Sequence, residues 1–155
     1  MTGYEMLSED LIEVAKVVNA HKTLLEFGSG YSTRYLGEHT NARIYTVEHN
    51  LEFWVREARH PKCTYIYCHI KYGSYDMDFI TGLNINPDIV LVDGPPGALS
   101  KESRKAPFEW AINCSSCSTI ILDDVDRDDE RNIIRSFESQ LDLVYLKRCV
   151  IATKK

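Results

Sequence analysis

The sequence predicts an α/β fold built on a mostly parallel, doubly wound sheet. Short apolar segments alternate with segments whose apolar residues recur at helical spacing, and such alternation is typical of parallel strands joined by right-handed crossovers. The segment 89–92 (IVLV) is apolar on both faces, as a buried parallel strand is. Glycines and prolines fall singly between these segments, and 155 residues is the length of one domain. We therefore expect a single domain over 1–155.

The expected elements follow one another with short connections. In chain order they are a helix within 1–22 that packs on the core, a strand at 23–27, a helix at 32–38, a strand at 43–49, a helix at 51–59, strands at 64–70 and 89–92, a helix at 102–111, a strand at 118–124, a helix at 132–141 and two closing strands in LVYL and CVIATKK. Ser8 and Asn50 are suitable N-caps for the helices that they precede, and Pro61 ends the second of these. The stretch 71–86 shows no regular pattern.

Composition and charge exclude several classes of function. The formal net charge is −5 and the lysines and arginines are scattered, which argues against a nucleic-acid partner. The longest aliphatic runs are far shorter than the roughly 20 residues that span a bilayer, so no membrane partner is expected. The N-terminus lacks a basic region followed by an apolar segment, and the five cysteines favour reduced thiols. These features predict a cytoplasmic protein.

The first candidate site lies at the carboxyl ends of the first two strands, where doubly wound sheets bind their ligands. The segment 26–30 (EFGSG) ends one strand and opens a helix, so its two glycines let the backbone approach a ligand at the helix N-terminus. A dinucleotide fingerprint would have a third glycine where this chain has Thr33. Glu48 ends the second strand, where a carboxylate can accept both hydroxyls of a ribose. Alternatively, Glu26 and Glu48 each cap a helix or pair with a nearby arginine.

The motifs LLEFGSG, YTVEHN, PDIVLVDGPP and TIILDD resemble those of the class I S-adenosylmethionine-dependent methyltransferases, over about residues 23–153. The resemblance implies a seven-stranded Rossmann-like sheet of order 3-2-1-4-5-7-6 whose last two strands form an antiparallel hairpin. It also implies S-adenosylmethionine as cofactor. The implied cofactor-binding residues are Glu26, Gly28, Ser29, Gly30, Glu48, His49 and Asp93. Gly28 and Gly30 would pass under the methionine part, Glu26 would help to hold its amino group, and Glu48 would bind the ribose.

A second candidate site is formed by Asp93, Asp123 and Asp124. In the resembled family the fourth and fifth strands are neighbours, so carboxylates at their ends can converge on one divalent cation such as Mg²⁺. In this the chain is similar to the metal-dependent O-methyltransferases of the catechol and caffeoyl type. It departs from them because Asp124 stands where they have Asn and Pro96 where they have Lys. Alternatively, Asp93 shapes the following turn, and the acids within 123–130 are solvated and favour the next helix.

The resemblance implies an enzyme that transfers a methyl group from S-adenosylmethionine to a small-molecule or saccharide hydroxyl. If a metal binds, it would lower the pKa of the acceptor hydroxyl; without a metal, Asp93 or His49 is the candidate base. The chain is close to the bare core of this fold, so the acceptor would bind at the interface of a homo-oligomer or in an open site. The alternatives are a non-catalytic cofactor-binding or partner-binding domain of the same fold, and a nicotinamide-dependent oxidoreductase.

Smaller signals lie near the same strand ends. Arg104 and Lys105 either bind an anionic substrate at the pocket rim or lie on a solvated helix face, and the second interpretation is favoured. Tyr31, Tyr72 and Tyr75 are pocket-edge candidates, but nine tyrosines in the chain make chance placement easy. Adenine would be recognised by backbone groups, His49 or Tyr72, because the chain lacks the acid that many relatives carry after the third strand.

Overall fold

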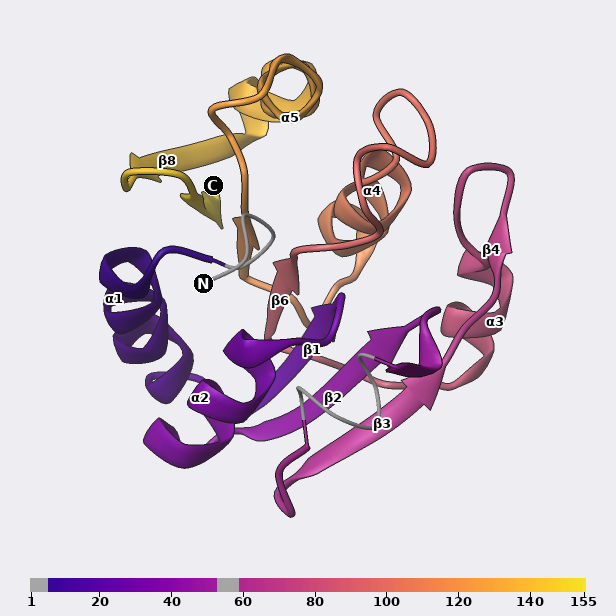
Figure 1. Ribbon diagram of the computed structural model, residues 1–155. Coiled ribbons are helices and arrows are strands. Elements are labelled where there is room, and N and C mark those ends of the chain that lie inside the picture. Colours follow the sequence, from indigo (N-terminus) through magenta and orange to yellow (C-terminus); the bar gives the residue numbers. More distant parts are fainter. Residues whose placement is uncertain (1–5, 53–58) are drawn as a thin grey trace.

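A seven-stranded sheet forms the centre of the computed structural model, which describes residues 6–52 and 59–155 (Figure 1). Its strands are β1 (Thr23–Phe27), β2 (Arg43–Glu48), β3 (Cys63–Tyr67), β6 (Ile89–Val92), β7 (Thr119–Leu122), β8 (Leu141–Tyr145) and β9 (Val150–Lys154). They lie in the order β3-β2-β1-β6-β7-β9-β8. Numbered along the chain without the separate hairpin of β4 (Ile70–Lys71) and β5 (Ser74–Tyr75), this is the predicted order 3-2-1-4-5-7-6.

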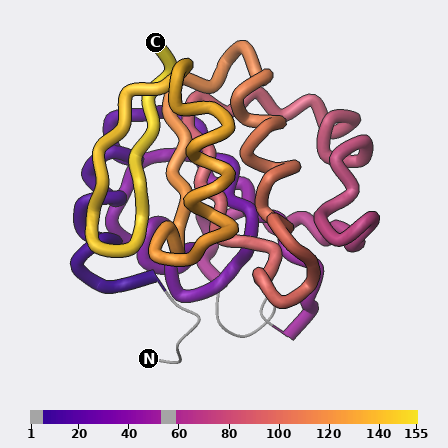
Figure 2. Tube along the Cα trace, turned by 90° about the horizontal axis from the view of Figure 1, so that it is seen from above, coloured from indigo at the N-terminus to yellow at the C-terminus, as the bar shows by residue number. Residues whose placement is uncertain are grey.

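Strand directions also agree with the prediction. β1 pairs in parallel with β2 and β6, and β7 continues the parallel part of the sheet beside β6. β9 runs antiparallel to both β7 and β8, so the closing strands form the expected hairpin at one edge of the molecule (Figure 2). The parallel strands place their carboxyl ends at one edge of the sheet, and this edge carries the candidate site.

Helices cover both faces of the sheet. They are α1 (Ser8–Asn19), α2 (Tyr31–His39), α3 (Met77–Gly82), α4 (Lys105–Asn113) and α5 (Asp128–Phe137), and a short 3₁₀ turn (Glu138–Gln140) follows the last. Because successive strand residues point to opposite faces, Leu24 packs with residues of α1 and α2, whereas Leu25 packs with residues of α3, α4 and α5. The two apolar clusters make a three-layer α/β/α arrangement. Among the described residues, none of the helices is both long and apolar enough to cross a bilayer.

The N-terminal helix begins differently from the prediction. Leu7 rather than Ser8 occupies the N-cap position of α1. Within the first turn of α1, the buried carboxylate of Asp10 accepts the backbone N–H groups of Lys147, Arg148 and Cys149, at the turn between β8 and β9. This contact joins the first helix to the closing hairpin.

Other boundaries shift for local reasons. The third strand ends at Tyr67 rather than at residue 70, and the stretch 71–86 contains the β4–β5 hairpin and α3. The helix expected at 102–111 begins at Lys105, so Pro107 falls in its first turn, where proline is tolerated. The helix expected at 132–141 begins at Asp128. Most of the helix expected at 51–59 lies outside the described residues.

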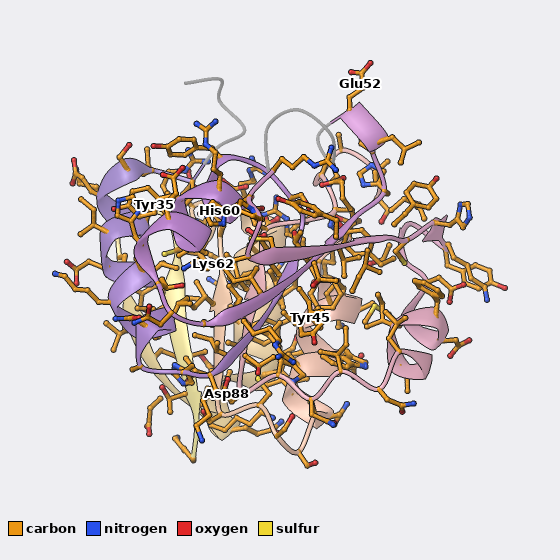
Figure 3. The ribbon with its side chains drawn as sticks, turned by 90° about the horizontal axis from the view of Figure 1, so that it is seen from below. Tyr35, Tyr45, Glu52, His60, Lys62 and Asp88 are labelled. Carbon is orange, nitrogen blue, oxygen red and sulfur yellow. The ribbon has the colours of Figure 1, made fainter. Side chains whose placement is uncertain are left out.

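A partly buried carboxylate joins the amino ends of β1 and β6. Asp88 precedes β6 (Figure 3). Its carboxylate accepts the backbone N–H groups of Lys22 and Thr23 at 2.9 and 2.8 Å. These two bonds lower the pKa of Asp88, against the opposing effect of its partial burial. The contact sets the register between β1 and β6 from the end of the sheet opposite the candidate site.

Candidate functional site

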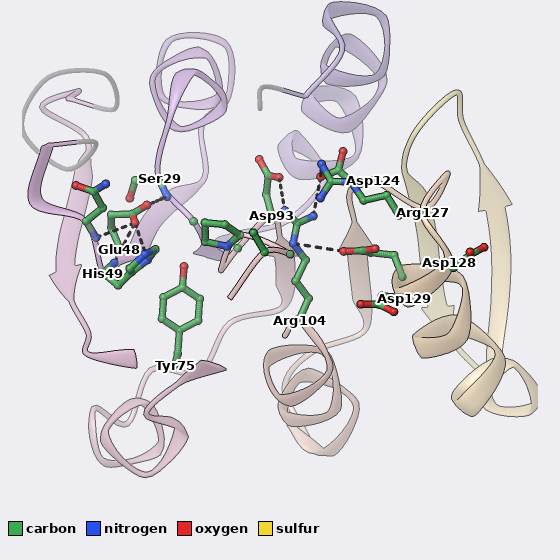
Figure 4. Close-up of a pocket in the computed structure, with 17 residues that line it drawn as sticks. Ser29, Glu48, His49, Tyr75, Asp93, Arg104, Asp124, Arg127, Asp128 and Asp129 are labelled. Atoms are coloured by element: carbon green, nitrogen blue, oxygen red, sulfur yellow. Dashed lines mark hydrogen bonds and ion pairs between the residues drawn. The ribbon is translucent and has the colours of Figure 1, made fainter. Parts of the chain in front are cut away.

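A pocket of about 610 Å³ opens at the carboxyl ends of β1, β2, β6 and β7 (Figure 4). This volume lies within the range of roughly 300–1,000 Å³ that is common for small-molecule sites. Five of the seven predicted cofactor-binding residues line it, namely Gly28, Ser29, Glu48, His49 and Asp93. Glu26 and Gly30 are not part of the lining. The turn after β1 and the acid that ends β2 therefore face one crevice, as the sequence predicts.

Gly28 is required by the close approach of two strand ends. Its φ is +96°, and a Cβ placed on it would lie 2.7 Å from the carbonyl oxygen of Asp93. Its N–H group donates to the carbonyl oxygen of Val47 at 2.8 Å, which ties the turn to β2 as well. Gly30 differs, because a Cβ placed there would meet nothing within 4 Å. Gly28 is thus required for the strand ends to approach each other, whereas Gly30 leaves space beside the start of α2.

Glu48 forms the centre of a hydrogen-bonded group at one end of the pocket. Its Oε2 accepts the backbone N–H of Ser29 at 2.8 Å, and its Oε1 accepts those of His49 and Asn50 at 3.0 Å each. Burial raises the pKa of this carboxyl group, and the N–H donors oppose that effect. The backbone therefore fixes the carboxylate, which still lines the pocket and can accept a ligand hydroxyl with the remaining lone pair of Oε2.

Glu26 lies beneath the pocket rather than in its wall. Its side chain is fully buried, and its two carboxyl oxygens accept the hydroxyls of Ser32 at 2.7 Å and Thr33 at 2.6 Å. Thr33 Oγ1 in turn accepts the N–H of Gly30 at 3.0 Å. Burial raises the pKa of Glu26 to about 7, against the lowering effect of these hydroxyl groups. These contacts make Glu26 a support for the first turn of α2.

Arg104 lies inside the acidic end of the pocket, which corrects the interpretation of this residue as part of a solvated helix face. Its side chain is only 4% exposed. Its guanidinium nitrogens lie 3.0 Å from Asp124 Oδ2, 3.7 Å from Asp93 Oδ1 and 3.9 Å from Glu130 Oε1. Arg104 immediately precedes α4, so its side chain turns toward the ends of β6 and β7 instead of following the helix surface.

The three acids of the predicted metal site do come together. Asp93, Asp123 and Asp124 each offer an oxygen, and these atoms lie within 4.8 Å of one another. Neither oxygen of the buried Asp123 has a hydrogen-bond partner among the described residues. Asp124, by contrast, is already paired with Arg104, with Arg127 at 3.0 Å and with Arg148.

This donor set does not fit a divalent cation. A cation bound between Asp93 and Asp124 would lie beside the guanidinium of Arg104, and the two positive charges would repel each other in a buried site. Asp93, Asp123, Asp124 and Glu130 carry four formal negative charges against three positive charges on Arg104, Arg127 and Arg148. Burial and the mutual repulsion of their carboxylates raise the pKa of both Asp93 and Asp123.

Only one of the three tyrosines expected at the pocket edge lines the pocket. Tyr75 lines the pocket with a buried side chain, whereas Tyr72 is 96% exposed, and neither Tyr72 nor Tyr31 is part of the lining. Arg127 lines the pocket too; the segment 123–127 is expected at a ligand-binding strand end, but no role of its own is predicted for Arg127. The signal that could have found it is its position three residues after Asp124, at the start of a helix that follows a strand end.

Comparisons with known proteins agree with this architecture. No family model matches the chain, and no curated protein matches it. Similar solved structures include a methyltransferase-like protein from Silicibacter pomeroyi, with a TM-score of 0.65, 17% identity and coverage of 97% of this chain and 87% of that one. Precorrin-6y C5,15-methyltransferase from Geobacter metallireducens has a TM-score of 0.66, 14% identity and coverage of 99% and 93%.

An S-adenosylmethionine-dependent O-methyltransferase from Thermotoga maritima has a TM-score of 0.65 and 10% identity, with coverage of 97% of this chain and 66% of that one. A tRNA and an rRNA methyltransferase are also similar in structure. At these identities the likeness shows the fold. The chain therefore has the Rossmann-like fold of the class I S-adenosylmethionine-dependent methyltransferases.

Proposed function

We propose that this protein binds S-adenosylmethionine in the pocket and transfers its methyl group to a hydroxyl of a small molecule or saccharide. One observation carries the proposal: Glu48 and the turn at Gly28 and Ser29 line the same pocket and are joined by a hydrogen bond. A ribose bound at Glu48 would bring the sulfonium end of the cofactor toward the ends of β1 and β6. The shared fold of the similar structures supports the same cofactor.

Four residues take distinct roles in holding the cofactor. The Glu48 carboxylate accepts a ribose hydroxyl, and His49 packs beside the nucleoside. Gly30 leaves room for the methionine part next to the start of α2. Glu26 is a positioning residue, because it acts on the turn through Thr33 and not by touching the ligand.

Asp93 is the proposed catalytic base. It lies in the pocket with its side chain 11% exposed, and burial raises its pKa well above its usual range, which brings a carboxylate closer to the basicity that proton transfer needs. The acceptor oxygen forms a bond to the methyl carbon while the bond from that carbon to sulfur breaks. The hydroxyl proton passes to Asp93, and the products are a methyl ether and S-adenosylhomocysteine. Since the donor is already activated, alignment of the two reactants supplies most of the catalysis.

The protein's own arginines take the electrostatic role that a metal has in related reactions. Arg104 holds a positive charge 3.7 Å from Asp93, so it opposes the accumulation of negative charge at this end of the pocket. We therefore propose a reaction that does not depend on a divalent cation.

RNA is the alternative acceptor, favoured by the similarity to RNA methyltransferases. The charge of the pocket favours a neutral acceptor instead. Asp128, Asp129 and Glu130 all line it at the start of α5, and they would repel a phosphate backbone.

A transfer assay tests the proposal. The protein is incubated with methyl-labelled S-adenosylmethionine and, in separate reactions, with hydroxyl-bearing small molecules, saccharides and RNA. We expect label in a small-molecule or saccharide fraction, and we expect Asp93→Asn to abolish transfer while S-adenosylhomocysteine still binds. Transfer to RNA alone would contradict the acceptor class. Cofactor binding without transfer to any acceptor would favour a non-catalytic binding domain of the same fold.

A further inference from the structure

Tyr75 holds a fixed position on the floor of the pocket. Its side chain is 2% exposed, and its ring packs against Phe27 with centroids 5.6 Å apart and against the edge of His49 at 6.1 Å. These contacts come from two different strand ends, because Phe27 closes β1 and His49 follows β2. The ring is therefore held by packing alone, and its hydroxyl is left to face the pocket.

The Tyr75 hydroxyl is buried and has no hydrogen-bond partner among the described residues. It lies next to Gly94, since a Cβ placed on that glycine would be 2.5 Å from it. Figure 4 shows the hydroxyl pointing up between His49 on one side and Asp93 on the other. An unpaired buried hydroxyl costs roughly 1–3 kcal/mol, so native proteins rarely keep one without a partner. A ligand in the pocket would supply that partner.

The surroundings identify the part of the ligand that the hydroxyl meets. After burial, Glu48 has the largest influence in raising the pKa of Tyr75, which places the hydroxyl in the field of the proposed ribose-binding carboxylate. The same burial keeps the hydroxyl protonated, and so it is a hydrogen-bond donor. A ligand that places its sugar at Glu48 brings the oxygen and nitrogen acceptors of a nucleoside to this floor.

We propose that Tyr75 is a cofactor-binding residue whose hydroxyl donates a hydrogen bond to the nucleoside part of the bound cofactor. This deepens the proposed function and rests on it. It also supplies a polar contact for the nucleoside in a chain without the acid that the resembled family carries after its third strand.

The test compares the wild type with Tyr75→Phe, which removes the hydroxyl and keeps the ring. Tyr72→Phe is the matched control, because Tyr72 is 96% exposed and lies outside the pocket. Calorimetry measures the affinity for S-adenosylhomocysteine and for 5′-methylthioadenosine, which keeps the nucleoside and lacks the amino acid. Thermal unfolding of each ligand-free protein is measured in parallel.

We expect Tyr75→Phe to weaken both ligands by roughly 3- to 30-fold, the effect of losing one hydrogen bond from a buried donor. Its ligand-free melting temperature should equal or exceed that of the wild type, because the variant no longer buries an unpaired hydroxyl. Tyr72→Phe should change neither quantity.

The outcomes separate this inference from the function on which it rests. If the wild type binds both ligands and Tyr75→Phe binds them equally well, the role of Tyr75 is wrong and the proposed function stands. A loss confined to S-adenosylhomocysteine would overturn the assignment to the nucleoside. A lower ligand-free melting temperature with unchanged affinity would show that the hydroxyl has a structural partner. If the wild type binds neither ligand, both proposals fail together.

Discussion

The Glu48 carboxylate accepts the backbone N–H of Ser29 at 2.8 Å, and this bond joins the acid that ends β2 to the glycine turn that follows β1. The two residues are 19 positions apart in the chain and lie at the carboxyl ends of neighbouring strands. The same carboxylate also receives the N–H groups of His49 and Asn50. The backbone of two loops therefore fixes this side chain before any ligand arrives, so little ordering is left to be done on binding.

Glu48→Gln tests this arrangement. Glutamine has one acceptor oxygen, so its NH₂ group must face at least one of the backbone donors, and leaving that donor unpaired should cost roughly 1–3 kcal/mol of stability. We also expect the affinity for S-adenosylhomocysteine to fall by roughly 10- to 100-fold, because the ribose loses a charged acceptor. Glu13→Gln on the exposed face of α1 is the control and should change neither value. Full affinity in the Glu48 variant would remove this residue from the ribose site.

Substitution by alanine should lower the stability of the protein at one glycine of the turn and not at the other. At Gly28 the new Cβ would lie 2.7 Å from a backbone oxygen at a φ of +96°, so Gly28→Ala should lose roughly 2–5 kcal/mol in chemical unfolding. Gly30→Ala should unfold like the wild type, because its Cβ meets nothing within 4 Å. We expect Gly30→Ala to weaken S-adenosylhomocysteine binding if the methionine part passes this residue. Equal stability of both variants would contradict the close approach of β1 and β6.

The raised pKa of Glu26 predicts a particular dependence of stability on pH. The unfolded chain releases this proton near the ordinary value of 4.5, whereas the folded protein keeps it up to about 7. Stability should therefore fall as pH rises through this window, and stay lower above it, by an amount on the order of 3 kcal/mol. Glu26→Gln has no proton to lose, so its stability relative to the wild type should rise over the same window. A parallel pH profile for the two proteins would show that Glu26 is not held protonated.

The arginine cluster predicts that divalent cations are not needed. Millimolar Mg²⁺ should leave the melting temperature of the wild type unchanged, since Arg104 already supplies the positive charge beside Asp93 and Asp124. A clear increase with Mg²⁺ would contradict the argument that the donor set does not fit a metal. Arg104→Met should cost roughly 3–5 kcal/mol, because it leaves buried carboxylates without their partner. Arg131→Met is the control, since Arg131 is 45% exposed and its contacts with the Asp128 carboxylate and the Asp126 carbonyl lie at the surface.

Most of the fold follows from patterns that are local in the sequence. The strand 89–92 is predicted because a buried parallel strand is apolar along its length, and the strand 23–27 because a short, mainly apolar run ends at a glycine turn. The sheet order follows from the motifs that carry the family resemblance. Short elements escaped this reasoning. The strands of the β4–β5 hairpin have two residues each, and α3 has six, too few for either periodicity to appear.

A site residue could be predicted from the sequence only where the end of its own strand determines its position. Glu48 and Gly28 fall into this class. Arg104 does not, because its burial depends on Asp93, Asp124 and Glu130, which come from three other segments of the chain. Tyr75 also could not be separated from the other tyrosines, because its position follows from a hairpin that the sequence does not show.

The central claim is that the pocket is shaped for an adenosyl ligand that carries a sulfur-linked amino acid. Calorimetric titration of the wild type with S-adenosylhomocysteine, and separately with NAD, tests it most directly. We predict saturable binding of S-adenosylhomocysteine at one site per chain, with or without Mg²⁺, and no comparable binding of NAD. Absence of heat with S-adenosylhomocysteine, or tighter binding of NAD, would contradict the account.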